Sequence, residues 1–130
     1  MFENIGNYAA FLGTSVALLL AAMVAYVMIT PLHEVRLIRA GNKAAALSLG
    51  GAAIGLALTL FGVASSTFVL VELLAWGAVG VVLQLAAYVA ISFVLPGYRR
   101  NIENDQVSYG IAGAAFSIAV GILNAGAIAG

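Results

Sequence analysis

Residues 68–95 read FVLVELLAWGAVGVVLQLAAYVAISFVL, and Glu72 is the only charged side chain among them. A helix needs roughly 20 apolar residues to cross about 30 Å of hydrocarbon, and this stretch exceeds that length. Each such run is apolar on all faces, without the period-two alternation of a barrel strand, and therefore predicts a helix. Three further stretches meet the same criterion, namely residues 8–29, 44–64 and 107–129. We expect an all-α membrane protein with four transmembrane helices in one domain, residues 1–130.

The composition supports lipid as the main solvent of this chain. Hydrophobic residues make up 64% of the sequence and charged residues only 8%, whereas a typical soluble domain has about 25% charged residues. The net charge is zero, so no field attracts nucleic acid. The absence of Cys excludes disulfides and thiolate metal sites. The first apolar run is too long for the core of a signal peptide, so we interpret it as an uncleaved span.

The basic residues predict the orientation in the membrane. All five lie in two polar segments, 30–43 and 96–106, while both tails and the turn at 65–67 have none. With four spans these two segments share one side, and the positive-inside rule makes that side the cytoplasm. Both termini are then expected on the outer, periplasmic side.

The two halves of the chain resemble each other. Each has an Ala-Tyr-Val shortly before a Pro, then charges, then a helix rich in small residues. This predicts a two-helix hairpin used twice, over about 8–64 and 68–129. Because each unit has an even number of spans, the copies would form a parallel repeat.

The polar segments contain helix start and stop signals. Thr30-Pro31 predicts a short amphipathic helix over residues 31–40, with Leu32, Val35 and Ile38 against the headgroups. Gly41 would end this helix, and Asn42 would cap the second span. In the second segment, Asn104 or Asp105 is expected to cap the last span.

The charged residues of these segments have two interpretations. His33 and Glu34 are expected to be solvated at the interface. Alternatively, acidic and basic residues pair across the two segments and set how the hairpins dock, although exposed pairs add little stability. The residues concerned are Glu34, Glu103 and Asp105 with Arg36, Arg39, Arg99 and Arg100.

Nothing in the sequence predicts an enzyme. One His beside one carboxylate is too few for a metal site, which needs three or four ligands. We find no phosphate loop, dinucleotide fingerprint or zincin motif, and no catalytic group, metal or cofactor is expected.

Small residues recur at every fourth position in three spans. Such stripes allow close helix approach in lipid, either within one bundle or between subunits, and we expect a homo-oligomer. The stripes comprise Gly13, Ala17, Ala21 and Ala25; Gly51, Gly55 and Thr59; and Gly113, Ser117, Gly121, Ala125 and Ala129.

One carboxylate and two amide side chains lie within the predicted spans. Glu72 is interpreted as an interfacial residue one turn from Trp76, or else as the lining of an outer vestibule. Gln84 and Asn124 are expected to bond to neighbouring helices, an interaction of about 0.6 kcal/mol on average. A solute site would require several such groups on one lining.

The segment TPLHEVRLIRAGNKAAALSLGGAAIG, residues 30–55, resembles a known family, as does the pattern Ile102-Glu103, Gly110-Ile111, Gly121 and Asn124-Ala125. It is similar to the YjfL-like bacterial inner-membrane proteins, the domain of unknown function 350. The resemblance spans nearly the whole chain. It implies four inner-membrane helices from a duplicated pair, and it brings no activity, substrate or catalytic residue.

Two functional classes therefore stay open. One is a structural membrane component that binds a membrane or cytoplasmic protein and self-associates. The other is a small channel or carrier for an ion or solute, lined by Gln84 and Asn124. A polar lumen past Gln84 would favour transport, whereas a closed bundle with an exposed small-residue face would favour assembly.

Overall fold

The computed structural model describes residues 2–29, 34–67 and 69–129, and all regular structure in these ranges is helical. The four long helices are apolar and long enough to cross a membrane, so the predicted all-α class is confirmed. The Thr30-Pro31 helix start lies outside the described residues. The elements are α1 (Phe2–Ile29), α2 (Glu34–Arg39), α3 (Lys43–Ser66), α4 (Leu70–Val94), α5 (Tyr98–Glu103) and α6 (Val107–Ala129).

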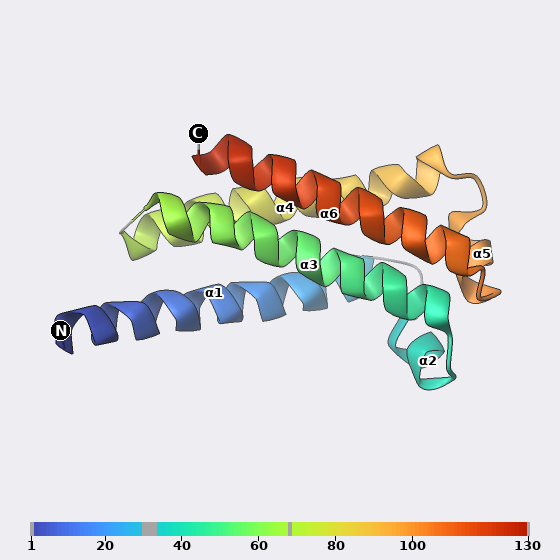
Figure 1. Cartoon of the computed structure of the whole chain (residues 1–130), viewed down its shortest axis with the longest axis horizontal. Coiled ribbons are helices and arrows are strands. Elements are labelled where there is room, and N and C mark those ends of the chain that lie inside the picture. Colours follow the sequence, from blue (N-terminus) through green and yellow to red (C-terminus); the bar gives the residue numbers. More distant parts are fainter. Residues whose placement is uncertain (1, 30–33, 68, 130) are drawn as a thin grey trace.

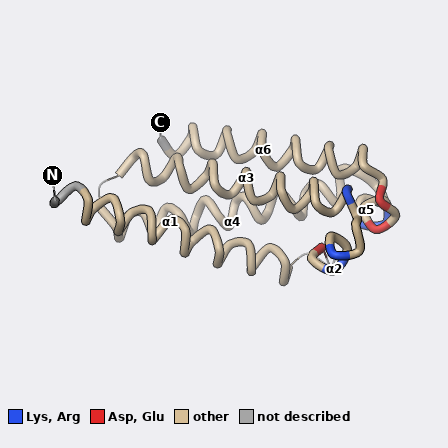
Figure 2. The backbone as a smooth tube through the Cα atoms, turned by 60° about the horizontal axis from the view of Figure 1, so that its bottom comes forward, with Lys and Arg blue, Asp and Glu red and all other residues tan. Residues whose placement is uncertain are grey.

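The four long helices form a bundle with two different ends. Both chain termini lie at one end, and α2 and α5 lie at the other (Figure 1). The Lys and Arg residues gather at the end with α2 and α5 (Figure 2), as the parity of four spans predicts. Which side of the membrane this end faces stays a prediction.

The most extensive helix pairing joins α3 to α6. A Cβ atom on Gly121 would come within 2.5 Å of the Gly55 carbonyl oxygen, and one on Gly110 within 2.6 Å of the Ala44 carbonyl oxygen. The two backbones thus touch directly, which is how helices in lipid gain packing energy. The stripes of α3 and α6 are therefore used inside the bundle.

The stripe of α1 has a different environment. Gly13, Ala17 and Ala21 are exposed, and a Cβ atom on Gly13 would meet nothing within 4 Å. Only 11% of the most apolar window of α1 is buried, against 50% for α3. The same small-residue spacing therefore faces outward on α1.

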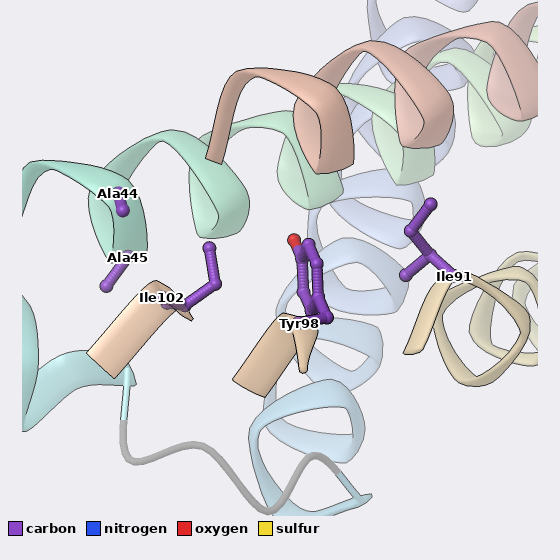
Figure 3. Packing of buried hydrophobic residues seen from close by; sticks show 5 residues of the cluster. All are labelled: Ala44, Ala45, Ile91, Tyr98 and Ile102. Atoms are coloured by element: carbon purple, nitrogen blue, oxygen red, sulfur yellow. The ribbon is translucent and has the colours of Figure 1, made fainter. Parts of the chain in front are cut away.

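A small apolar cluster anchors the short helix α5. Ala44 and Ala45 of α3, Ile91 of α4, and Tyr98 and Ile102 of α5 are buried together. Figure 3 shows the Tyr98 ring between Ile102 and Ile91, with its hydroxyl turned toward the long helices. This cluster holds α5 under the ends of α3 and α4.

Both short helices end in the same way. After α2, Gly41 has φ +91° and Asn42 N–H bonds to the Leu37 carbonyl. After α5, Asp105 has φ 58° and Gln106 N–H bonds to the Asn101 carbonyl. Each is a helix end closed by one left-handed residue, the Schellman geometry, which Gly adopts most easily. The order long, short, long thus occurs twice, while the duplication itself stays a prediction.

Candidate functional site

Asn42 joins the two polar linkers. Its side-chain oxygen accepts from Ala45 N–H at 2.7 Å, so it caps α3 as predicted. Its side-chain amide donates to the carbonyls of Ile102 at 2.8 Å and Glu103 at 3.3 Å. Asn42 thus bonds a backbone N–H in the first turn of α3 and two backbone carbonyls at the end of α5, groups that lack partners within their own helices.

Asp105 completes this contact, which we call the linker clasp. Its carboxylate accepts from the backbone N–H groups of Lys43 and Ala44, both at 2.9 Å. The prediction that Asp105 or Asn104 caps α6 is therefore corrected: Asp105 caps α3, and Asn104 ends α5. The left-handed backbone of Asp105 turns its side chain toward the start of α3. The residues next to Asp105 in the sequence do not predict this orientation.

The expected ion pairs across the linkers are also corrected. Among the described residues the ion pair is Arg99 with Glu103, at 3.1 Å and four residues apart within α5. Both side chains are about half exposed, so the pair contributes little. At the linkers, the two hairpins are joined instead by the hydrogen bonds of the Asn42 amide and the Asp105 carboxylate to backbone groups.

The prediction that Glu34 is solvated is wrong, because only 1% of this residue is exposed. Tyr26 donates its hydroxyl to Glu34 Oε1 at 2.6 Å. Burial raises the pKa of Glu34 to about 7, and the Tyr26 bond opposes this shift. Of the α2 face expected against the headgroups, Val35 is 47% exposed, as that expectation requires, whereas Ile38 packs with Leu37 against the buried cluster. Leu32 lies outside the described residues.

Three tyrosines from three helices gather near Glu34. The Tyr26 and Tyr88 rings lie edge to face with centroids 4.5 Å apart. The Tyr88 hydroxyl donates to the Ala52 carbonyl at 2.7 Å, and the Tyr98 and Ser48 hydroxyls lie 2.9 Å apart. The three rings line a cavity of about 230 Å³ between α1, α4 and α5. We call it the tyrosine cavity; its wall is otherwise mostly apolar.

Gln84 is fully buried in the centre of the bundle. Its amide donates to the Ser117 carbonyl at 2.7 Å, and its oxygen accepts from Thr59 at 3.3 Å. Asn124 donates to the Gly80 carbonyl at 3.1 Å and to Thr59 at 3.4 Å. Both amides therefore join α3, α4 and α6, which is the bonding role that the sequence predicted for them.

Glu72 lies at the end of the bundle away from the linkers. It is exposed and accepts from the Thr67 hydroxyl at 2.6 Å. Together with Trp76 and Asn124 it lines a second cavity, of about 500 Å³, between α3, α4 and α6. Glu72 and Asn124 thus line the same cavity. Gln84 is connected to Asn124 through hydrogen bonds to the Thr59 hydroxyl.

The predicted candidates fall into three places. Gly41, Asn42, Asp105 and the backbone of Glu103 meet at the linker clasp, and Glu34 lies beside the tyrosine cavity. Gln84, Asn124 and Glu72 run from the centre to the second cavity. Within the described residues no three His, Asp or Glu side chains form a group able to hold a metal ion.

Known proteins are similar to this chain over almost its whole length. The family described as Domain of Unknown Function (DUF350) matches residues 1–128. The chain belongs to this family. The inner membrane protein YjfL of Escherichia coli (strain K12) is 27% identical over 125 residues, covering 96% of this chain and 95% of YjfL. The transmembrane protein YshE of Bacillus subtilis (strain 168) is 28% identical over 116 residues, covering 88% and 85%.

The comparisons and the helices agree on the broad class of protein. No solved structure matches this DUF350 chain. Its four long apolar helices and its relatives make it a multi-pass membrane protein.

Sequence reasoning missed the tyrosines and their hydroxyl partners. Tyr26 and Tyr88 were noted only as markers of a repeat, and Tyr98 not at all. The available signal was that Tyr98 lies in the second polar linker, while Tyr26 and Tyr88 lie in the last two turns or so of the spans that precede the linkers. Spacing alone could not show that their rings enclose one cavity.

Proposed function

We propose that the protein is a structural component of the bacterial inner membrane that self-associates and binds a partner protein through α1. The single observation that carries this proposal is the exposed small-residue face of α1. Gly13, Ala17 and Ala21 line it, and the exposed side chains of Val16 and Leu20 stand beside it. A groove of small residues flanked by larger ones suits a second helix.

The chain itself shows how such a face is used. On α3 and α6, Gly55 and Gly121 bring the backbones into contact. α1 has the same spacing, but among the described residues nothing lies against Gly13. Since apolar side chains gain nothing by leaving lipid, the close backbone approach that small residues permit is the main reason for two helices to pair. A second α1 offers the complementary surface.

The centre of the bundle also fits a component without a lumen. Gln84 is 0% exposed and bonded on both amide atoms, and the α3 and α6 backbones touch beside it. A conducting path would have to open this contact.

Disulfide crosslinking in membranes tests the association. The chain has no native Cys, so Ala17→Cys introduces a single thiol on the α1 face. We expect it to give a disulfide dimer, while Leu123→Cys on α6, which is 73% exposed and thus also accessible, gives none. Ala17→Leu should lower the dimer fraction in bilayers. A protein that stays monomeric in bilayers by single-molecule photobleaching would refute the proposal.

A small channel or carrier is the second candidate, and one observation favours it. Glu72 and Asn124 share the second cavity, and Thr59 connects Asn124 to Gln84. Polar groups therefore extend from one end of the bundle to its centre. Flux of ions or small solutes into liposomes of the pure protein decides between the two, because a scaffold gives no flux above empty vesicles.

A further inference from the structure

The tyrosine cavity has a wall of aromatic carbon. The hydroxyls of Tyr26, Tyr88 and Tyr98 are directed to Glu34, the Ala52 carbonyl and Ser48, within the bundle. All three tyrosines line the cavity, and these hydrogen bonds fix the positions of their rings there. The faces of aromatic rings carry negative potential and attract cations.

A buried carboxylate stands one ring behind this wall. Glu34 Oε1 accepts from Tyr26, whereas Oε2 is buried and has no hydrogen-bond partner among the described residues. A buried carboxylate oxygen without a partner is costly and calls for a donor or a positive charge. The described titratable groups around Glu34 are the three tyrosines, and Arg36 and Arg39 on its own helix are exposed.

We propose that the tyrosine cavity binds an ammonium group carried on a short apolar body. The ammonium would lie against the rings of Tyr26, Tyr88 and Tyr98, on the side toward Glu34. The negative charge of Glu34, held behind the Tyr26 ring, would attract the ammonium electrostatically. The proposal is independent of association through α1.

The rest of the cavity fits the apolar body. Leu85, Val89 and Ile91 of α4 line it, and Phe93 stands at its lipid-facing side with 81% exposure. Arg99 also lines the cavity, and its guanidinium is paired with Glu103. Because the Phe93 side of the cavity is exposed, a ligand can enter from the bilayer interface. Either a free amine or the ethanolamine headgroup of a lipid supplies this chemistry.

Calorimetry on the full chain in phosphatidylcholine nanodiscs tests the site. Cyclohexylammonium is the probe, cyclohexanol is its neutral counterpart, and empty nanodiscs give the background. We expect saturable binding of the amine and none of the alcohol. Glu34→Gln, which keeps the side-chain shape, should weaken amine binding about tenfold. Glu72→Gln, at the other end of the bundle, should leave it unchanged.

Two outcomes overturn the proposal. One is equal binding of amine and alcohol, and the other is wild-type affinity in Glu34→Gln. Tyr88→Leu supplies a second variant, chosen because it keeps an apolar side chain while removing the ring, and it should also weaken the amine. Circular dichroism checks that each variant keeps its helix content.

Lipid composition and pH refine the result. In phosphatidylethanolamine nanodiscs, loss of amine binding by competition identifies the lipid headgroup as the ligand, and unchanged binding identifies a free amine. Binding should tighten as pH rises from 6 to 8, because Glu34 becomes charged. His33→Gln should keep this pH dependence and Glu34→Gln should lose it; the reverse pattern contradicts the proposal.

Discussion

Glu34 has the most unusual environment of any residue discussed above. Only Tyr26 donates to it among the described residues, and burial disfavours its charged form. The group therefore titrates near neutral pH at the end of the bundle that carries the basic linkers. A change of its charge acts directly on the contact between α2 and α1.

Glu34 makes folding stability dependent on pH. Its pKa rises from an ordinary 4.5 to about 7 in the folded protein, so its contribution is fully present below pH 4.5 and is lost as pH rises to 7. A shift of this size corresponds to about 3 kcal/mol. Thermal unfolding in detergent should show the wild type losing stability across this window relative to Glu34→Gln. Parallel curves for the two proteins would contradict this.

The carboxylate of Asp105 stabilises the start of α3. Asp105→Gly keeps the left-handed backbone and removes both bonds to Lys43 and Ala44, so we expect a loss of about 1–2 kcal/mol by chemical unfolding. Glu103→Gln is the matched control, because among the described residues its side chain makes only the exposed pair with Arg99. Equal effects of the two variants would rule out the clasp as the cause.

At the scale of elements, α3 and α6 form the most closely packed pair, and the other helices pack around it. Their contact relies on glycines that leave no room for a side chain. Gln84 and Asn124 then tie α4 to this pair through hydrogen bonds. α1 packs only partly on the bundle and keeps a free face.

A single methyl group should separate α3 from α6. In Gly121→Ala the new Cβ would lie within 2.5 Å of the Gly55 carbonyl, so the helices must shift, at a cost of about 1–3 kcal/mol. Gly126→Ala on the same helix meets nothing within 4 Å and should be neutral or slightly stabilising. Both are measured by unfolding in mixed micelles, and a neutral Gly121→Ala would disprove the close contact.

For the whole molecule, the main expectation concerns its orientation. Both termini lie at the end of the bundle opposite the basic linkers (Figure 2). The positive-inside rule then places the termini in the periplasm and the linkers in the cytoplasm.

Cysteine labelling of intact cells checks this orientation. We expect an impermeant thiol reagent to label Asn4→Cys and Gly130→Cys from outside and to leave Lys43→Cys unlabelled until the membrane is permeabilised. Labelling of Lys43→Cys in intact cells, with the termini protected, would show that the chain has the opposite topology.

The sequence by itself determined the features that depend on neighbouring residues. The four spans follow from the length and apolarity of each segment, and α6 begins and ends at the predicted residues, Val107 and Ala129. The common end of the basic linkers follows from the parity of the spans. The Asn42 cap is local to its helix, and buried amides in lipid must find neighbours, which made the role of Gln84 predictable.

Only the tertiary structure decided how distant residues meet. Asp105 and Lys43 are 62 positions apart and join through one left-handed turn. Glu34 is buried because of how α2 is oriented on the bundle, and a six-residue helix is too short for its hydrophobic pattern to specify that orientation. The tyrosine cavity needs three helices to converge. Such contacts arise from the docking of whole elements, which no local pattern of residues encodes.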